Sequence, residues 1–235
     1  MNPAMPRRQR PTRPPAGRRH APHSPADTDA ASAPRIVGGS LRGRRLPHLP
    51  GGVTRPMKDR VRETLFDLLG TSVRGAVALD LFAGTGALGF EALSRGADRA
   101  VFAERHFPTA ELLRQTARSL DVEARCEIRP GDVLLWPKRM PDLPAAAPWL
   151  VFVSPPWAMF AEGHERHRDL LALVAAIQRA APAGSTLVVE ADTAFDPAHL
   201  PDAAGWESRA VPPAVLHILR PGRVPEPPAS GIFAG

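Results

Sequence analysis

The chain has 235 residues, of which 43% are hydrophobic and 23% charged, and its formal net charge is +6. This length predicts one globular domain with tails, and no apolar run approaches the roughly 20 residues needed to cross a bilayer, which argues against a membrane protein. A single cysteine, Cys126, excludes an intrachain disulfide and offers no thiol cluster for a metal, so we expect a cytoplasmic protein without a metal site.

The two ends of the chain differ in composition from its middle. Residues 1–34 contain six arginines, two aspartates and eight prolines but almost no large apolar side chain, and residues 221–235 add four more prolines. Such segments bury too little apolar surface to offset the entropy of ordering. We therefore expect a disordered basic tail over 1–34, a flexible tail over 221–235 and a folded domain over 35–220.

Between the tails, apolar runs of strand length alternate with helical patterns, which is typical of a parallel sheet covered by helices. The predicted helices cover residues 57–69, 86–95, 108–120 and 169–181. Buried strands are predicted at 77–82, 100–104, 124–128, 149–153 and 185–190, and a closing antiparallel hairpin at 208–211 and 214–219. We expect an α/β fold with a mostly parallel sheet of seven strands. Residues 35–46, rich in glycine and arginine, are expected as a strand or small basic hairpin outside this sheet.

A glycine-rich turn follows the first predicted strand. Asp80 stands at the end of that strand, and the turn leads from there into the next helix. Its glycines match the G-x-G-x-x-G spacing that often holds a dinucleotide pyrophosphate. A carboxylate at Asp80 would repel a pyrophosphate but attract the cationic amino-acid end of S-adenosylmethionine. The turn therefore predicts S-adenosylmethionine as the cofactor, bound by Asp80, Phe82, Ala83, Gly84 and Gly86.

Two further acids follow the next two predicted strands. Glu104 ends the second strand, where it is placed to accept hydrogen bonds from both ribose hydroxyls. Asp132 follows the third strand and is placed to bind the adenine amine. The carboxyl ends of consecutive parallel strands line the crevice in which open α/β sheets bind ligands. Each acid alone is also compatible with a helix cap or a solvated loop, but together with Asp80 they favour one cofactor site.

The turn Ser154-Pro155-Pro156-Trp157 follows the fourth predicted strand. Two prolines fix the backbone and donate no hydrogen bond, which leaves the nearby carbonyls free to accept one. A side-chain oxygen and a carbonyl there would hold the two N–H groups of a base amine and aim its lone pair at the methyl group. Trp157 would stack on a base that has left its helix. A strand-ending proline turn with a packed tryptophan is the structural alternative. We expect these four residues to be catalytic.

Three stretches of the chain together closely resemble the bacterial 16S ribosomal RNA guanine-N2 methyltransferase family: the run from Asp80 to Gly89, Thr54-Arg55-Pro56 with Asp59-Arg60-Val61, and Arg35 to Gly39. The resemblance covers about residues 35–220. It implies a Rossmann-like class I methyltransferase that uses S-adenosylmethionine to methylate a guanine of small-subunit ribosomal RNA, free or in an assembly particle, and we expect a monomer. It also implies RNA contacts from the arginines of the extension over 35–56, namely Arg35, Arg42, Arg44, Arg45 and Arg55.

One position departs from that family, which usually has Asp where this chain has Ser154. Serine keeps an acceptor oxygen but supplies no carboxylate. A base amine loses its proton easily after attack, so we expect the chemistry to be retained. Two alternatives stay open. The turn also resembles that of DNA cytosine-N4 methyltransferases, and other base amines, such as adenine N6, share the chemistry. The substitution is also compatible with a ribosome-assembly protein that has lost turnover.

Overall fold

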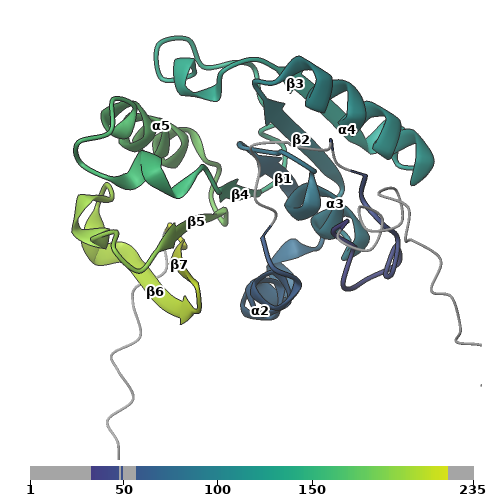
Figure 1. Cartoon of the computed structure of the whole chain (residues 1–235), viewed down its shortest axis with the longest axis horizontal. Helices are drawn as coiled ribbons and strands as arrows, with labels where there is room; N and C mark the ends of the chain where they lie inside the picture. The colour runs from purple at the N-terminus through teal and green to yellow at the C-terminus, as the bar shows by residue number, and fades with distance from the viewer. Residues whose placement is uncertain (1–32, 48, 50–56, 222–235) are drawn as a thin grey trace, which may run out of the picture.

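The computed structural model describes residues 33–47, 49 and 57–221, which form a seven-stranded sheet with helices on both faces (Figure 1). Apart from residues 33, 34 and 221, the two predicted tails lie outside the described residues, and so does Arg55. The strands are β1 (Val77–Asp80), β2 (Arg99–Glu104), β3 (Cys126–Pro130), β4 (Trp149–Val153), β5 (Thr186–Asp192), β6 (Trp206–Val211) and β7 (Ala214–Leu219).

In space the strands run in the order β3-β2-β1-β4-β5-β7-β6. Strands β1 to β5 pair in parallel, whereas β7 is antiparallel to both β5 and β6. The predicted α/β fold, mostly parallel sheet and closing hairpin are therefore confirmed. Strand β3 begins two residues later than predicted, because Glu123–Arg125 first forms a 3-10 turn. The strand order reverses between β1 and β4, which is where open sheets of this kind bind ligands.

Within the described residues, four α-helices cover the sheet: α2 (Asp59–Leu69), α3 (Ala87–Ser94), α4 (Phe107–Ser119) and α5 (His167–Ala180). Alternate strand residues face opposite sides of a sheet. Ala78 and Phe152 accordingly pack in one apolar core with residues of α2, α3 and α4, whereas Leu79 and Val151 pack in a second core with residues of α5. Figure 1 shows α5 on the opposite side of the sheet from α2 and α3.

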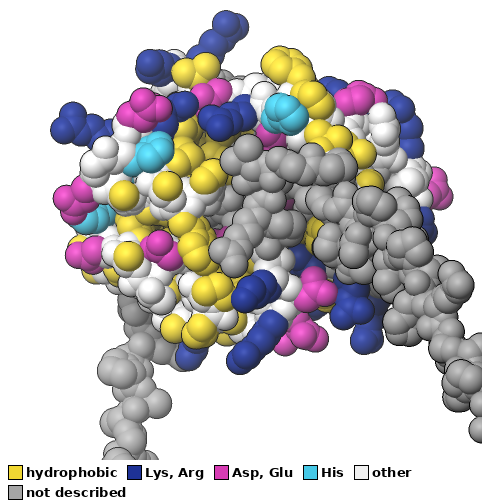
Figure 2. Space-filling model, in the orientation of Figure 1, with side chains coloured by type: hydrophobic (Ala, Val, Ile, Leu, Met, Phe, Trp, Pro, Cys, Tyr) yellow, Lys and Arg dark blue, Asp and Glu magenta, His cyan; other side chains and the backbone are white. Residues whose placement is uncertain are grey.

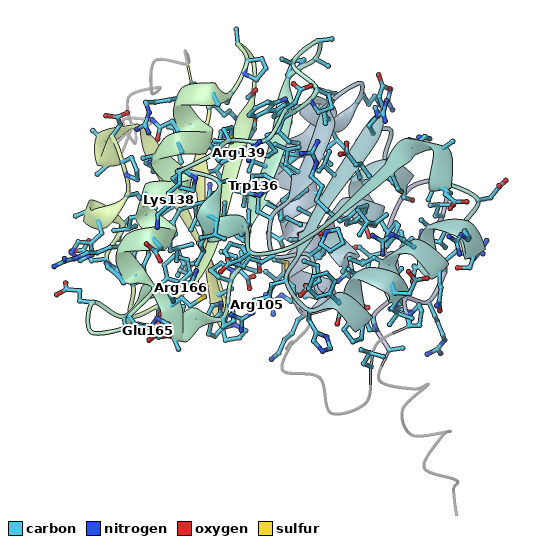
Figure 3. The ribbon with its side chains drawn as sticks, turned by 90° about the horizontal axis from the view of Figure 1, so that it is seen from above. Arg105, Trp136, Lys138, Arg139, Glu165 and Arg166 are labelled. Carbon is cyan, nitrogen blue, oxygen red and sulfur yellow. The ribbon has the colours of Figure 1, made fainter. Side chains whose placement is uncertain are left out.

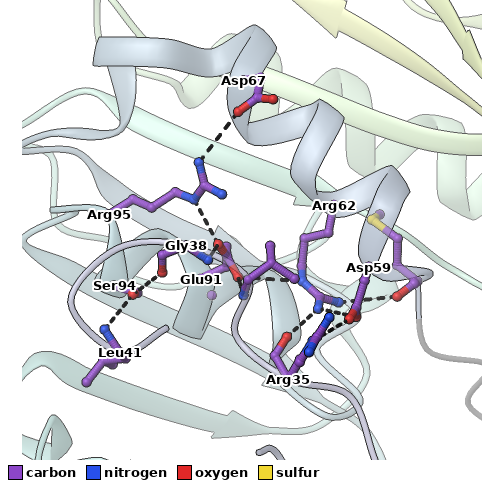
Figure 4. A network of polar contacts seen from close by, with 12 residues as sticks. Arg35, Gly38, Leu41, Asp59, Arg62, Asp67, Glu91, Ser94 and Arg95 are labelled. Carbon is purple, nitrogen blue, oxygen red and sulfur yellow. Dashed lines mark hydrogen bonds and ion pairs between the residues drawn. The ribbon is translucent and has the colours of Figure 1, made fainter. Parts of the chain in front are cut away.

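A buried network of charges attaches the N-terminal segment to the helical layer (Figure 4). The side chain of Arg62, on α2, is fully buried; it donates to the backbone carbonyl of Arg35 and lies 3.6 Å from the carboxylate of Glu91 on α3. That carboxylate also accepts the backbone N–H groups of Val37 at 2.7 Å and Gly38 at 2.8 Å. A buried ion pair is stabilised by the further hydrogen bonds that its groups make. The N-terminal segment supplies three of them, and Asp59 accepts another from Arg62 at 2.8 Å.

The N-terminal segment forms a hairpin outside the main sheet, as predicted. A single antiparallel bridge between Arg35 and Arg45 closes it, in place of extended strands. At its tip Gly39 has φ +75°, and a Cβ on it would lie 2.0 Å from the carbonyl oxygen of Ser94. Only glycine fits there. Across the ranges that the structure describes, no helix is long and apolar enough to cross a membrane.

Candidate active site

A cavity of about 670 Å³ opens at the carboxyl ends of β1, β2 and β4, and its volume lies within the range of small-molecule sites. The strand ends bring together the residues that the sequence predicts for cofactor and catalysis, with Gly86 as the exception. The lining includes Asp80, Phe82, Ala83, Gly84, Glu104, Asp132, Ser154, Pro155, Pro156 and Trp157.

Gly86 does not line the cavity; it is the last residue of the glycine-rich turn, at the N-cap of α3. Its φ is +75°, and a Cβ there would approach Leu113 and Phe90 to 2.6 Å. Its N–H donates to the carbonyl of Ala83 at 2.6 Å, which closes the turn. Glycine is therefore needed at this position for the turn and for helix packing.

Asp80 is a buried carboxylate at the mouth of β1, with 2% of the residue exposed. Its Oδ2 accepts the backbone N–H of Gly89 at 3.0 Å. Burial raises the pKa of Asp80 to about 7; the hydrogen bond from Gly89 opposes that shift and the nearby charge of Glu104 adds to it. A ligand that carries positive charge into this cavity would therefore stabilise the ionised form.

Glu104 ties two loops together at the end of β2. Its Oε2 accepts the backbone N–H of Gly84 at 2.9 Å, and its Oε1 accepts that of His106 at 2.8 Å. Each carboxylate oxygen has a second lone pair, so both oxygens keep the capacity to accept a hydroxyl from the cavity. The two backbone hydrogen bonds fix the position of the carboxylate at the cavity.

Asp132 is engaged on both oxygens. Oδ1 caps the short 3-10 helix Val133–Leu135 by accepting the N–H of Leu134 at 3.0 Å, and Oδ2 accepts a hydrogen bond from Arg166 at 2.7 Å. Asp132 is therefore a helix cap through Oδ1, as one interpretation of the sequence allowed, and an ion-pair partner through Oδ2. Arg166 lies just before α5, and Figure 3 shows it on the same side of the molecule as Arg105, Lys138 and Arg139.

Ser154 directs its hydroxyl at a residue that the sequence interpretation did not single out. Its Oγ donates a hydrogen bond to the carboxylate of Glu190, on β5. Glu190 is 7% exposed, and it lines the cavity together with Ser154. Burial raises its pKa, and the hydrogen bond from Ser154 opposes that rise. The signal that could have identified Glu190 was available, since it is an acid near the carboxyl end of a predicted parallel strand.

The prediction that the carbonyls of the proline turn are free is wrong for Pro156. Its carbonyl accepts the backbone N–H of Met159 at 2.9 Å, because residues 157–160 turn at once into a 3-10 helix whose first N–H groups need acceptors. Trp157 is half-buried: it packs against the apolar core and also lines the cavity. Its ring therefore has both a structural contact and a face available to a ligand.

Four of the arginines expected to contact RNA lie in the described residues, and all four, Arg35, Arg42, Arg44 and Arg45, are exposed along the N-terminal hairpin. Arg35 pairs with Asp59 at 3.0 Å. Arg44 donates to the carbonyl of Ser119, the last residue of α4, which lies at the end of that helix away from the cavity. Arg42 and Arg45 lie in the same hairpin and are also exposed. On the face drawn in Figure 2, Lys and Arg side chains occur at several separate places between acidic ones and do not gather into one patch.

Solved structures with the same fold cover most of this chain. A structure from Escherichia coli described as "Putative methyltransferase yhhF" has a TM-score of 0.61 at 28% identity, and the match covers 79% of this chain and 96% of that one. A hypothetical protein from Thermus thermophilus has a TM-score of 0.59 at 28% identity, covering 80% of this chain and 99% of the other. The predicted class I methyltransferase fold is confirmed.

Curated relatives match over shorter stretches. Ribosomal RNA small subunit methyltransferase D of Haemophilus influenzae is 38% identical over 127 residues, which are 52% of this chain and 63% of that protein. Its Escherichia coli K12 namesake is 54% identical over 70 residues, 30% of this chain and 35% of that protein. The chain thus spans less than two thirds of the length of these relatives.

Within the part of the chain that is described, no group of three or more His, Cys, Asp or Glu side chains is placed to hold a metal ion. The family described as "Conserved hypothetical protein 95" matches residues 34–205, which include the glycine-rich turn, the proline turn and all the cavity-lining strand ends up to Glu190. The chain belongs to this family.

Proposed function

We propose that this protein transfers a methyl group from S-adenosylmethionine to the exocyclic N2 amine of a guanine in 16S ribosomal RNA. The main support for the proposal is that two acids, Asp80 and Glu104, line the same cavity as the Ser154 turn. The names of the matched relatives, which are ribosomal RNA small subunit methyltransferases, support the choice of substrate. Under this proposal the protein acts in the cytoplasm, where the small subunit is assembled, and it acts as a monomer.

The residues around the cavity fit this cofactor. Buried Asp80 would hold the cationic amino-acid end, whose charge would offset the cost of ionising a buried carboxylate. Glu104, fixed by two backbone N–H groups, would accept the ribose hydroxyls. Asp132 would face the adenine amine, with Arg166 keeping its carboxylate in place. When bound, the cofactor supplies an electrophilic methyl group on a sulfonium.

The Ser154 turn would position the base. A guanine N2 amine has its lone pair delocalised into the ring, so it reacts only when its geometry is constrained. The Oγ of Ser154 and the carbonyl of Pro155 would accept its two N–H bonds, since the carbonyl of Pro156 is already engaged. Trp157 would stack on the extruded base, a contact that aromatic side chains supply without regard to sequence.

Incubation with methyl-labelled S-adenosylmethionine tests the proposal. The substrates are 30S particles and 16S RNA from cells that lack this protein, with duplex DNA as a parallel substrate, and the digested nucleosides are then separated. We expect label in N2-methylguanosine from the ribosomal substrate. Label in N4-methylcytosine of DNA would favour the DNA enzyme. Cofactor binding by calorimetry without transfer to any substrate would favour an assembly protein without turnover.

A further inference from the structure

Ser154 and Glu190 come together because of strand register. Val153 of β4 is paired with Val189 of β5, so the next residues along these parallel strands, Ser154 and Glu190, stand opposite each other. Both follow the alternation that sends Phe152 and Val188 into the core on the side of α2 and α3. Their hydrogen bond, with Oγ donating to Oε2, thus follows from the sheet itself.

This hydrogen bond fixes the chemical character of the serine. A hydroxyl has one hydrogen and two lone pairs. Because Ser154 directs its hydrogen at Glu190, its lone pairs are left for a donor in the cavity that both residues line. Without Glu190 the hydroxyl could rotate and point its hydrogen at the substrate amine, which would be the wrong polarity. The pair therefore presents an acceptor backed by a carboxylate.

We propose that Glu190 is a positioning residue for methyl transfer: it orients the Ser154 hydroxyl as an acceptor and receives, through that hydroxyl, the proton that the substrate amine releases. This inference rests on the proposed function and adds to it a proton acceptor that the serine alone does not provide. The carboxylate that Ser154 itself lacks is thus supplied by Glu190, one hydrogen bond away.

The step balances in atoms and electrons. The lone pair of the amine nitrogen forms the bond to the methyl carbon while the carbon–sulfur bond breaks, and its electron pair stays on sulfur, which becomes a neutral thioether. The methylated nitrogen then carries a positive charge and loses one proton to Oγ of Ser154. The hydroxyl proton of Ser154 passes to Oε2 of Glu190, which becomes a neutral carboxylic acid. That acid releases its proton to solvent when the product leaves.

The surroundings of Glu190 allow this role. The residue is buried, and burial favours uptake of a proton by a carboxylate. The charged and titratable groups that share its cavity come from the N-cap of α2, from β1 and β2, and from the loops after β2 and β3, namely Lys58, Asp80, Glu104, Arg105, His106 and Asp132. On its other side, Pro213 of the turn before β7 and Ala214 of β7 line the cavity, and neither carries a charge. His217 of β7 pairs with Val189 and so faces the opposite side of the sheet.

The kinetic test compares Glu190→Gln with wild type at saturating S-adenosylmethionine, with 30S particles from cells that lack the protein. Glutamine has nearly the same size as glutamate, and its side-chain oxygen still accepts the hydrogen bond from Ser154. Its amide does not take up a proton near neutral pH. We expect kcat to fall about a hundredfold, in the range that general base catalysis supplies, with little change in KM for the cofactor. The acidic limb of the kcat–pH profile should also disappear. The matched control is Glu207→Gln, an exposed glutamate on the edge strand β6, which should leave kcat unchanged.

A rescue variant separates this role from a structural one. Ser154→Asp combined with Glu190→Gln places a carboxylate directly at the turn and an amide donor behind it. We expect at least tenfold more activity than Glu190→Gln alone has. A purely structural glutamate would not be replaced by a carboxylate at position 154, so absence of rescue together with an unchanged pH profile would overturn the inference.

A second readout needs no cofactor or RNA. Carbon-13 NMR of the glutamate side chains in the ligand-free protein should assign to Glu190 a pKa above that of an ordinary glutamate. Ser154→Ala should raise it further, because the serine hydrogen bond lowers it. If Glu190→Gln keeps the wild-type kcat while wild type methylates RNA, the inference fails and the proposed function stands. If wild type methylates no ribosomal substrate, both fail.

Discussion

The carboxylate of Asp80, at the end of β1, accepts the backbone N–H of Gly89 in the first turn of α3 at 3.0 Å. This contact joins the strand to the helix across the glycine-rich turn, and Gly89 itself packs against the ring of Phe102 on β2. One side chain thus holds the turn in shape and also faces the cavity. Substitutions at Asp80 and Gly89 therefore separate structural from ligand-binding effects.

Cofactor affinity should depend on pH through Asp80. Its pKa is about 7 in the ligand-free protein, and a cationic ligand binds the ionised form. S-adenosylmethionine should therefore bind about eightfold more tightly at pH 7.5 than at pH 6, with proton uptake by the empty site opposing binding at the lower pH. Calorimetry at both pH values measures this. In Asp80→Asn the affinity should be lower and nearly independent of pH. Equal affinity of wild type at the two pH values would refute the assignment of Asp80.

Asp80 should also lower the stability of the ligand-free protein at neutral pH. A carboxyl whose folded-state pKa lies above its unfolded value favours folding while protonated, and that contribution is lost as pH rises from about 4 to 7. Asp80→Asn removes the buried charge and keeps an oxygen for the N–H of Gly89. Between pH 4 and pH 8, the free energy of unfolding of the variant should rise by on the order of 3 kcal/mol relative to that of wild type. Urea unfolding of both proteins across this range measures the gain, and a relative stability that does not change with pH would contradict it.

Gly89→Ala should destabilise the fold although alanine is the better helix former. A Cβ at this position would lie 2.2 Å from the ring of Phe102, so the core must shift, at a typical cost of about 1–3 kcal/mol. Gly163→Ala is the matched control, because a Cβ there meets no atom within 4 Å. Urea unfolding should show a loss for the first variant and almost none for the second. Equal stability of the two would mean that α3 and β2 separate easily.

Glu91→Ala should release the N-terminal hairpin. The substitution removes the buried carboxylate beside Arg62, leaving only the half-exposed Asp59 at 2.8 Å as its ion-pair partner, and it removes the acceptor of two backbone N–H groups. Breaking a buried pair in this way costs about 3–5 kcal/mol. Glu111→Ala on α4 is the control, because its ion pair with Arg114 is exposed and should contribute less than about 1 kcal/mol. Trypsin should also cleave the hairpin of the first variant faster than that of the second.

Much of the fold and half of the site follow from local patterns. Buried strands and amphipathic helices are visible as apolar periodicity. Acids at the ends of parallel strands are expected to gather at one crevice, and Asp80 and Glu104 do line the cavity. The same rule applies to Glu190, but no motif surrounds this residue in the sequence. Its role depends on β4 and β5 being neighbours in register, and the sequence does not state which strands are neighbours.

The remaining contacts could not be predicted because their partners are distant in sequence. The burial of Arg62 depends on Glu91 and on a carbonyl in the N-terminal hairpin, although arginine on a helix is usually solvated. The pairing of Asp132 with Arg166 depends on how the segment before α5 returns to the sheet. Such contacts follow from tertiary packing, which single-residue patterns do not encode.

Mass spectrometry of 16S ribosomal RNA from cells that lack this protein tests the central claim most directly. We predict the loss of one N2-methylguanosine, restored by the wild-type chain and not by a chain carrying Glu190→Gln at the same expression level. A full complement of N2-methylguanosine in the deletion strain would contradict the proposed activity.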